Sequence, residues 1–204
     1  NLLNCPAMTQ DMKNTYVIRA PLTITESWDD EKGWHFTNKD LNQLSQTEFD
    51  KLFLLTPGSD NKLLLTLPQL FIDWGSYLFF ADEPTLAQIQ PANYHETKFS
   101  KFPFITGSFE IDKWCRPISF GIINQKKEDI VIQRNDPLYY IKFFSKKDVV
   151  LKRFSMTAEI LSIITGSLTI KKFLKGSSMR RLYEMFMQSG NKKRILREIN
   201  KQFE

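Results

Sequence analysis

The spacing of apolar residues changes at Phe154, and this change constrains the fold more than any other feature of the sequence. Before Phe154, short apolar runs rich in β-branched and aromatic residues are separated by turn signals about every ten residues. After it, apolar residues recur at intervals of three and four, which is helical spacing. The sequence therefore predicts an antiparallel β domain over residues 1–154 and a basic helical extension, packed on it, over residues 155–204.

The first part of the chain is expected to form many short strands. Pro21 interrupts the first of them, because proline lacks the N–H that a sheet ladder needs. No strand alternates with a helix of 10–15 residues, so a Rossmann-like layout is disfavoured. The expected fold is mainly β, an antiparallel β-sandwich or a jelly-roll-like barrel. A short helix is expected over residues 5–14, and strands over residues 15–28, 34–36, 76–84, 107–114, 117–123, 129–133, 138–144 and 149–154.

The extension is expected to contain three helices. Gly176 ends the first helical pattern, and Ser177 or Ser178 can cap the next one. Gly190 and Asn191 repeat this stop-and-cap signal before the last apolar stripe.

Composition limits the class of protein. With 42% hydrophobic and 13% aromatic residues, the chain of 204 residues can bury a sizeable core, which excludes intrinsic disorder. Cys5 and Cys115 match no metal or redox spacing, so we expect two reduced thiols in a cytoplasmic setting; one long-range disulfide is the alternative. No window has the run of roughly 18 apolar residues that a membrane span needs. The sequence starts without Met and without a signal-peptide pattern.

The net charge of +5 is concentrated in the tail. From Lys171 to Glu204 there are ten Lys or Arg and three Glu, which gives +7 and leaves −2 for the rest of the chain. A basic helix face suits phosphate contact or an anionic membrane surface, although such a face is more often only solvated. The candidates for nucleic-acid binding are Lys192, Lys193, Arg194, Arg197 and Lys201.

Known catalytic motifs are not found. The two histidines, His35 and His95, lack the His-x-Asp or His-x-His start of an iron oxygenase site, although a His35/His95/Glu96 site remains geometrically open. There is no Gly-x-Ser-x-Gly, no Walker A element and no Gly-x-Gly-x-x-Gly. We therefore expect no catalytic residue, no metal and no cofactor, and we favour a protein that is not an enzyme.

The stretch FEIDKWCRP, residues 109–117, is the most site-like part of the sequence. Trp114 and Arg116 are of the types that dominate recognition surfaces, so they are the candidates for protein binding. The competing interpretation packs Trp114 in the core and pairs Arg116 with a carboxylate. By contrast, the corner Arg134–Pro137 is expected only to turn the chain, because Asn135 tolerates positive φ and Pro137 suits the start of a strand.

Three segments, CPAMTQDMKNTYVIRAP, GSFEIDKWCRPISF and IQRNDPLYYIKF, resemble an uncharacterised family of proteins from T4-like marine phages and some bacteria. This resemblance covers most of residues 4–154 and implies a phage origin, and hence the host-cell cytoplasm, but no activity. More distantly, IQRNDPL resembles the Ile-x-x-Gly-Asp-x-Ile strand entry of the deoxyuridine triphosphatase and deoxycytidine triphosphate deaminase fold. Asn135 replaces the glycine, and that family's glycine-rich phosphate loop is missing.

The function expected from the sequence is that of a soluble binding or accessory protein that acts through protein contacts or self-association. Two alternatives stay open. One is nucleic-acid binding through the basic helices, and the other is a nucleotide-processing or metal-dependent enzyme of unrecognised type.

Overall fold

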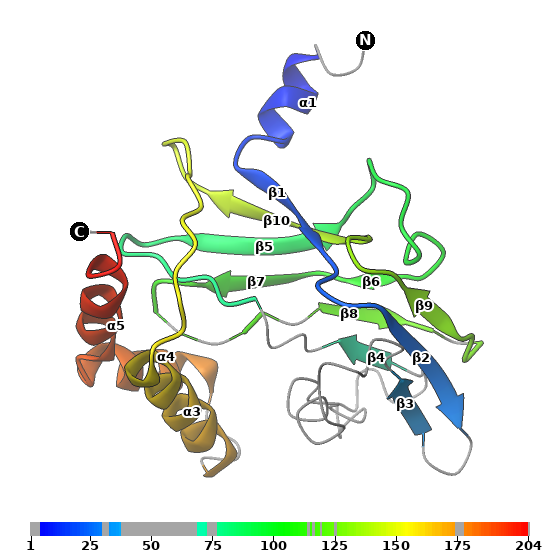
Figure 1. The fold of residues 1–204 in the computed structure, drawn as a ribbon. Coiled ribbons are helices and arrows are strands. Elements are labelled where there is room, and N and C mark those ends of the chain that lie inside the picture. Colours follow the sequence, from blue (N-terminus) through cyan, green and yellow to red (C-terminus); the bar gives the residue numbers. More distant parts are fainter. Residues whose placement is uncertain are drawn as a thin grey trace. The chain divides into compact units, whose positions relative to one another are not determined.

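The structure is a computed structural model (Figure 1). It describes residues 5–29, 33–37, 69–72, 77–113, 115, 117, 118, 120–124, 126–173 and 178–203. The chain divides into two compact units. The first comprises Asn1–Tyr77, Gln88–Ser108 and Pro117–Lys142, and the second comprises Leu78–Ala87, Phe109–Arg116 and Phe143–Glu204.

The described strands form three sheets and follow a short helix, α1 (Pro6–Asp11), as predicted. The strands are β1 (Thr15–Arg19), β2 (Ile24–Asp29), β3 (Gly33–Thr37), β4 (Gln69–Ile72), β5 (Leu86–Pro91), β6 (Phe104–Ile105), β7 (Gly107–Glu110), β8 (Phe120–Ile123), β9 (Ile130–Ile132) and β10 (Pro137–Phe144). The sheets have the orders β1-β10-β5-β7, β3-β2-β9 and β4-β8-β6. Antiparallel pairing joins β1 to β10, β2 to both β3 and β9, and β8 to both β4 and β6.

Pro21 separates β1 from β2, as the sequence predicted, and each strand then finds a different partner. β1 pairs with β10 from Thr15 opposite Lys142 to Ile18 opposite Tyr139. β2 pairs with β3 on one side and with β9 on the other. The two strand segments predicted over residues 15–28 and 34–36 thus pair with each other through β2 and β3.

Aromatic packing holds the first unit together. The buried ring of Phe120 lies 5.3 Å from that of Phe99, 5.8 Å from that of Phe104 and 5.0 Å from that of Tyr139, measured between ring centroids. Tilted and edge-on aromatic pairs add favourable electrostatics to the burial of apolar area. Since these residues come from β8, β6, β10 and the segment before β6, one ring links strands of different sheets within the unit.

The corner before β10 turns the chain, as expected. Asn135 has a φ of 73°, and its N–H donates to the carbonyl of Ala20 at 2.8 Å. The N–H of Ala20 donates in return to the carbonyl of Asp136 at 2.9 Å. The Asp136 carboxylate accepts from the N–H of Gln133 at 2.9 Å. These bonds satisfy the backbone groups of the turn and fasten it to the end of β1.

The second unit carries the three predicted C-terminal helices, α3 (Ala158–Phe173), α4 (Met179–Gln188) and α5 (Asn191–Asn200). Ser178 caps α4 by accepting from the N–H of Arg181, and Gly190 adopts a φ of 73° between α4 and α5. Helix α5 contacts both α3 and α4 (Figure 1). The core residues of this unit are Cys115, Ile160, Ile163, Ile164, Leu182, Phe186 and Ile195.

Three strand predictions were wrong in part or whole. In the run 76–84, Leu78 forms only an isolated bridge, and Leu78 and Phe80 pack against the helical core instead. Residues 149–154 form no strand, because Phe154 also packs into that core while Val150 faces solvent. The strand predicted over 107–114 ends at Glu110.

The overall class is only partly as predicted. Antiparallel sheets and C-terminal helices are both present, in similar proportion, and the described sheets do not close into a barrel. The sandwich arrangement and the domain boundary at residue 154 stay predictions. Most of residues 48–74 lies outside the described residues. None of the helices described is both long and apolar enough to cross a membrane.

Candidate functional site

The site-like segment of the sequence begins as a turn after β7. The N–H of Ile111 donates to the carbonyl of Thr85 at 3.1 Å, and the Ile111 carbonyl accepts from Ala81 at 3.4 Å. The Asp112 carboxylate accepts from the N–H of Thr85 at 3.2 Å. Ile111 and Asp112 are therefore both buried, although strict strand alternation would have put them on opposite faces.

Asp112 receives a compensating charge from α5. The Nζ of Lys192 lies 3.4 Å from Asp112 Oδ2, and the exposed fractions of the two side chains are 16% and 4%. A buried carboxylate needs a partner, because burial removes the water that would otherwise solvate its charge. This pair fixes the turn to the helix within the second unit.

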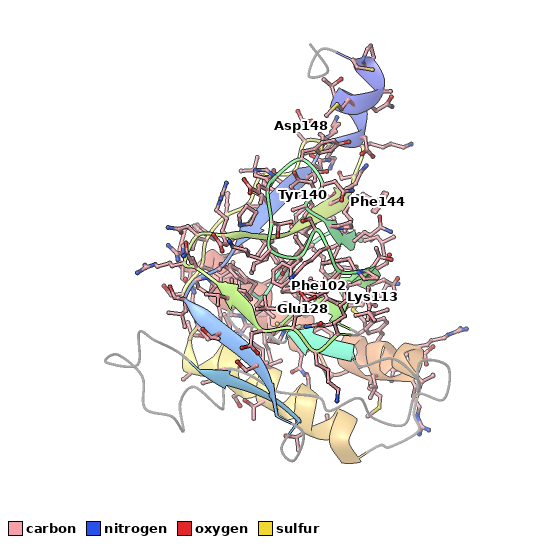
Figure 2. All side chains as sticks on the ribbon, turned by 90° about the vertical axis from the view of Figure 1, so that its right-hand side faces the viewer. Phe102, Lys113, Glu128, Tyr140, Phe144 and Asp148 are labelled. Carbon is pink, nitrogen blue, oxygen red and sulfur yellow. The ribbon has the colours of Figure 1, made fainter. Side chains whose placement is uncertain are left out.

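A cavity of about 420 Å3 lies between this turn and α4. The end of β7 contributes Glu110, the turn contributes Lys113, and α4 contributes Tyr183 and Met187 to its described lining. Tyr183 also packs against the buried core of the unit, and this contact holds its wall of the cavity in place. Lys113 is labelled in Figure 2. We call this feature the α4 cavity.

Charges around the α4 cavity are paired. Lys113 Nζ lies 2.5 Å from Glu110 Oε1, and Arg180 Nε lies 3.1 Å from Glu184 Oε1. The hydrogen bond with Glu110 is the largest cause that raises the pKa of Lys113, against the opposing effect of desolvation. Lys113 is thus held as a protonated ammonium, which does not act as an amine nucleophile. The cavity walls therefore present aromatic and thioether groups, and the charged side chains around the rim neutralise one another in pairs.

The two protein-binding candidates, Trp114 and Arg116, lie outside the described residues. Their described neighbours differ sharply in environment. Lys113 borders the α4 cavity, whereas Cys115 is completely buried in the helical core.

The five basic candidates on and after α5 do not form one open cationic face. Lys192 is bound to Asp112, Arg194 lies 2.6 Å from Glu159, and Lys201 lies 2.7 Å from Glu198. Lys193 and Arg197 are exposed. Lys201 is the largest cause that lowers the pKa of Glu198. A phosphate backbone would have to compete with these carboxylates for three of the five cations.

His95 is engaged in the first unit. Its Nδ1 lies 2.6 Å from the hydroxyl oxygen of Tyr140, which is labelled in Figure 2, and Tyr94 stacks on the same tyrosine. Burial is the largest cause that raises the pKa of Tyr140. The side chain of His35 lies outside the described part of the chain. Among the described residues, no group of three His, Cys, Asp or Glu is placed to hold a metal ion.

Both cysteines are free thiols. Cys5 is exposed beside α1, and Cys115 is buried among the helices of the second unit. Burial raises the pKa of Cys115 from its ordinary 9.0 to about 12. A thiol that stays protonated and lacks solvent access is a poor nucleophile, which gives Cys115 a packing role.

Comparison with protein-family models, with curated proteins and with solved structures finds no match.

Proposed function

We propose that the chain is a non-enzymatic accessory protein that binds a protein partner through the α4 cavity. The observation that supports this is the composition of the cavity, in which Tyr183 and Met187 are bordered by charged side chains that form ion pairs with one another. Tyrosine, methionine and arginine are enriched at protein interfaces, and methionine adapts to varied apolar partners.

The same composition indicates the kind of group that binds. Because Lys113 and Arg180 already have carboxylate partners, the cavity holds no uncompensated charge for an anionic ligand among its described residues. A volume of about 420 Å3 accommodates an apolar anchor side chain and its adjacent backbone. The rim charges would then set the orientation of the bound segment more than its affinity.

The test is an NMR titration of the 15N-labelled full chain with N-acetyltryptophanamide and N-acetylleucinamide. These probes present one apolar side chain and a capped backbone, and we expect dissociation constants on the order of millimolar. Binding should shift the amide signals of the 110–113 turn and of α4.

A matched pair of variants on α4 locates the binding. Met187 lines the cavity and Met185 does not, yet their exposed fractions are similar, 43% and 38%. Met187→Glu should abolish the shifts, and Met185→Glu should leave them unchanged. If neither probe shifts the turn or α4, or if both variants behave alike, the proposal fails.

The nucleic-acid alternative has weaker support, because three of its five candidate cations are held by carboxylates. For the metal-dependent enzyme alternative, the described residues offer no group of three His, Cys, Asp or Glu placed to hold a metal ion. A phage origin, with action in the host cytoplasm, is the part of the proposal that rests on the family resemblance alone.

A further inference from the structure

The chain between β10 and α3 runs as one extended stretch, drawn in yellow in Figure 1. From residue 148 to residue 157 it makes no turn and no bend, and it pairs with none of the described strands. Its middle is open to solvent. Val150 and Leu151 expose 76% and 43% of their surface, and Lys152 and Arg153 are exposed as well. We call residues 150–153 the open segment.

The backbone of the open segment makes no hydrogen bond in the described part of the chain. Each of its four residues has an N–H and a carbonyl that a strand ladder would use. The sequence favours a strand here too, because Val149, Val150 and Phe154 are of the β-branched and aromatic types that strands prefer. Strand propensity and an extended backbone are therefore both present, and a second strand to pair with is what the segment lacks.

Contacts at the C-terminal end hold the open segment in this conformation. Gln202 Oε1 accepts from the N–H of Ser155 at 2.6 Å, and Gln202 Nε2 donates to the Ser155 carbonyl at 3.1 Å. One side chain thus makes the two hydrogen bonds that a residue of an antiparallel strand would make. Phe154 packs against the helical core, and Lys152 Nζ lies 5.2 Å from the centroid of the Phe203 ring. A segment that is already held extended loses less conformational entropy when it binds.

Charge indicates the kind of strand that fits. From residue 146 to residue 153 the sequence has four Lys or Arg and one Asp, which gives +3. Lys147 is partly offset by Glu83, whose Oε1 lies 3.0 Å from its Nζ. Lys152 and Arg153 are adjacent, so in an extended chain they point to opposite sides. A partner strand that carries Glu or Asp would meet a cation on either face, and opposite charges across two strands stabilise their pairing.

The same features disfavour two other occupants. A second copy of the open segment would bring its own cations to the pairing, and like charges across two strands repel. In the apolar part of a lipid bilayer, the unbonded N–H and carbonyl groups of the segment would lose water without gaining a partner.

We propose that the open segment binds an extended, acidic segment of a partner protein by strand addition, in which the two backbones pair as neighbouring strands. The main-chain hydrogen bonds supply affinity, and Lys152 and Arg153 select a partner with acidic side chains. The open segment contains none of the residues that line the α4 cavity, and this inference does not depend on the function proposed for that cavity.

Amide hydrogen exchange of the 15N-labelled full chain, followed by NMR, tests the pairing directly. The probe is an acetylated and amidated hexapeptide in which Glu and Val alternate, and the control peptide has Lys in place of Glu. In the free protein, the amides of the open segment should exchange fast, because they are exposed and unbonded. The acidic peptide should bind with a dissociation constant on the order of 100 µM and, at ten times that concentration, slow exchange at least about fivefold at alternate residues. The effect should alternate because successive N–H groups of a strand point to opposite edges, and the peptide covers one edge.

Proline variants separate backbone pairing from side-chain contact. Val150→Pro and Leu151→Pro each delete one N–H, and both should fold, since neither N–H is bonded in the free protein. The variant whose N–H is the one that the peptide protects should lose binding. Proline at the other position should be tolerated, because its missing N–H faces away from the peptide.

Arg153→Glu and Lys193→Glu form a matched pair for charge. Both replace an exposed cation and change the net charge equally, but only Arg153 belongs to the open segment. Arg153→Glu should weaken binding of the acidic peptide at least about fivefold, and Lys193→Glu should change it less than about twofold. Met187→Glu, which blocks the α4 cavity, should also leave this binding intact, so that the failure of one proposal can be told from the failure of the other.

Four outcomes would overturn the proposal. The acidic peptide would protect no amide of the open segment, or the lysine peptide would bind as tightly as the acidic one. The same amides would be protected in a dimer of the chain without any peptide, which would make a second copy the occupant. A short DNA duplex would protect them when the acidic peptide does not, which would assign the segment to a phosphate backbone.

Discussion

The Nζ of Lys192 lies 3.4 Å from Asp112 Oδ2, although 80 residues separate the two in the sequence. Asp112 also accepts from the N–H of Thr85, so one buried carboxylate joins three segments of the second unit. The pair changes the role of Lys192, because a cation held in this way stabilises the fold and is poorly placed to contact a phosphate.

Breaking this pair should destabilise the protein. Asp112→Ala leaves Lys192 and the Thr85 N–H without their carboxylate, and we expect a loss of about 2–4 kcal/mol in the free energy of unfolding. Lys192→Met leaves the buried carboxylate without its cation and should lower the free energy of unfolding by about 1–3 kcal/mol. The double variant should lose less than the sum of the two. Urea denaturation measures all three.

Lys201 provides the control for this cycle. Lys201 exposes 59% of its side chain, against 16% for Lys192, so water screens its pair with Glu198 and Lys201→Met should have a free energy of unfolding close to that of the wild type. Strictly additive losses for the Asp112 and Lys192 variants would show that the two side chains do not interact.

A second prediction concerns nucleic acid. Three of the five candidate cations, Lys192, Arg194 and Lys201, are held by carboxylates, so a phosphate backbone that binds them would have to displace these partners. In fluorescence polarisation at physiological salt, we expect binding to a short DNA duplex weaker than about 10 µM, with a shallow dependence on salt.

The matched variant is Lys193→Gln with Arg197→Gln, which removes the two candidates that belong to none of these three ion pairs and leaves the paired ones in place. Affinity tighter than about 1 µM that falls steeply with salt, and that these substitutions reduce, would restore the basic tail as a nucleic-acid surface.

Local sequence signals predicted the backbone structure correctly where the interactions that determine it are also local. Pro21 cannot donate to a ladder, Asn135 tolerates a left-handed backbone, and Ser178 accepts from the first turn of α4. Each of these effects involves neighbours within a few residues, so the sequence predicts it without knowledge of the fold.

The errors arose where distant contacts decide the structure. The apolar run around Leu78 and Phe80 resembles a buried strand, but the same side chains can equally fill a helical core from an irregular segment. Conversely, β5 was missed, although Ala87 and Ile89 are buried and alternate with glutamines, because the run is short and ends in Pro91.

The geometry around residues 109–113 could not be predicted from the sequence, for the same reason. Sequence analysis selected residues 109–117 as a distinctive segment, but strand alternation could not reveal that Asp112 turns inward. Nor could it show that Lys192 returns to meet this carboxylate, since that contact depends on the packing of α5. The pairing of Arg194 with Glu159 is equally non-local.

A third prediction tests the corner before β10. Asn135 has a φ of 73°, and it contributes its backbone N–H and carbonyl to the turn, the latter accepting from Arg19 at 2.9 Å. Asn135→Gly should therefore change the free energy of unfolding by no more than a few tenths of a kcal/mol, whereas Asn135→Val should cost about 1–3 kcal/mol. Equal losses for glycine and valine would mean that the side chain, and not the backbone conformation, is what matters at this position. Thermal unfolding of the three proteins makes the comparison.

The last prediction follows from the buried thiol of Cys115, whose pKa is raised from 9.0 to about 12. Between these values the thiol is protonated in the folded state and ionised in the unfolded state, so the unfolded state binds fewer protons. The stabilising contribution of Cys115 is therefore complete below about pH 9, and it falls as the pH rises toward 12, by at most about 1.4 kcal/mol per pH unit.

Other groups also titrate at alkaline pH, so the informative quantity is the difference between proteins. Cys115→Ala should be less stable than the wild type at pH 7, because it leaves a cavity in the helical core. That deficit should shrink between about pH 9 and pH 11, since the variant has no thiol to ionise. Cys5→Ala removes an exposed thiol and should follow the wild type at every pH. Urea denaturation at each pH decides the matter: a deficit for Cys115→Ala that stays constant would mean that the thiol ionises as readily in the folded protein as in the unfolded chain, and hence that the core around α3, α4 and α5 admits water.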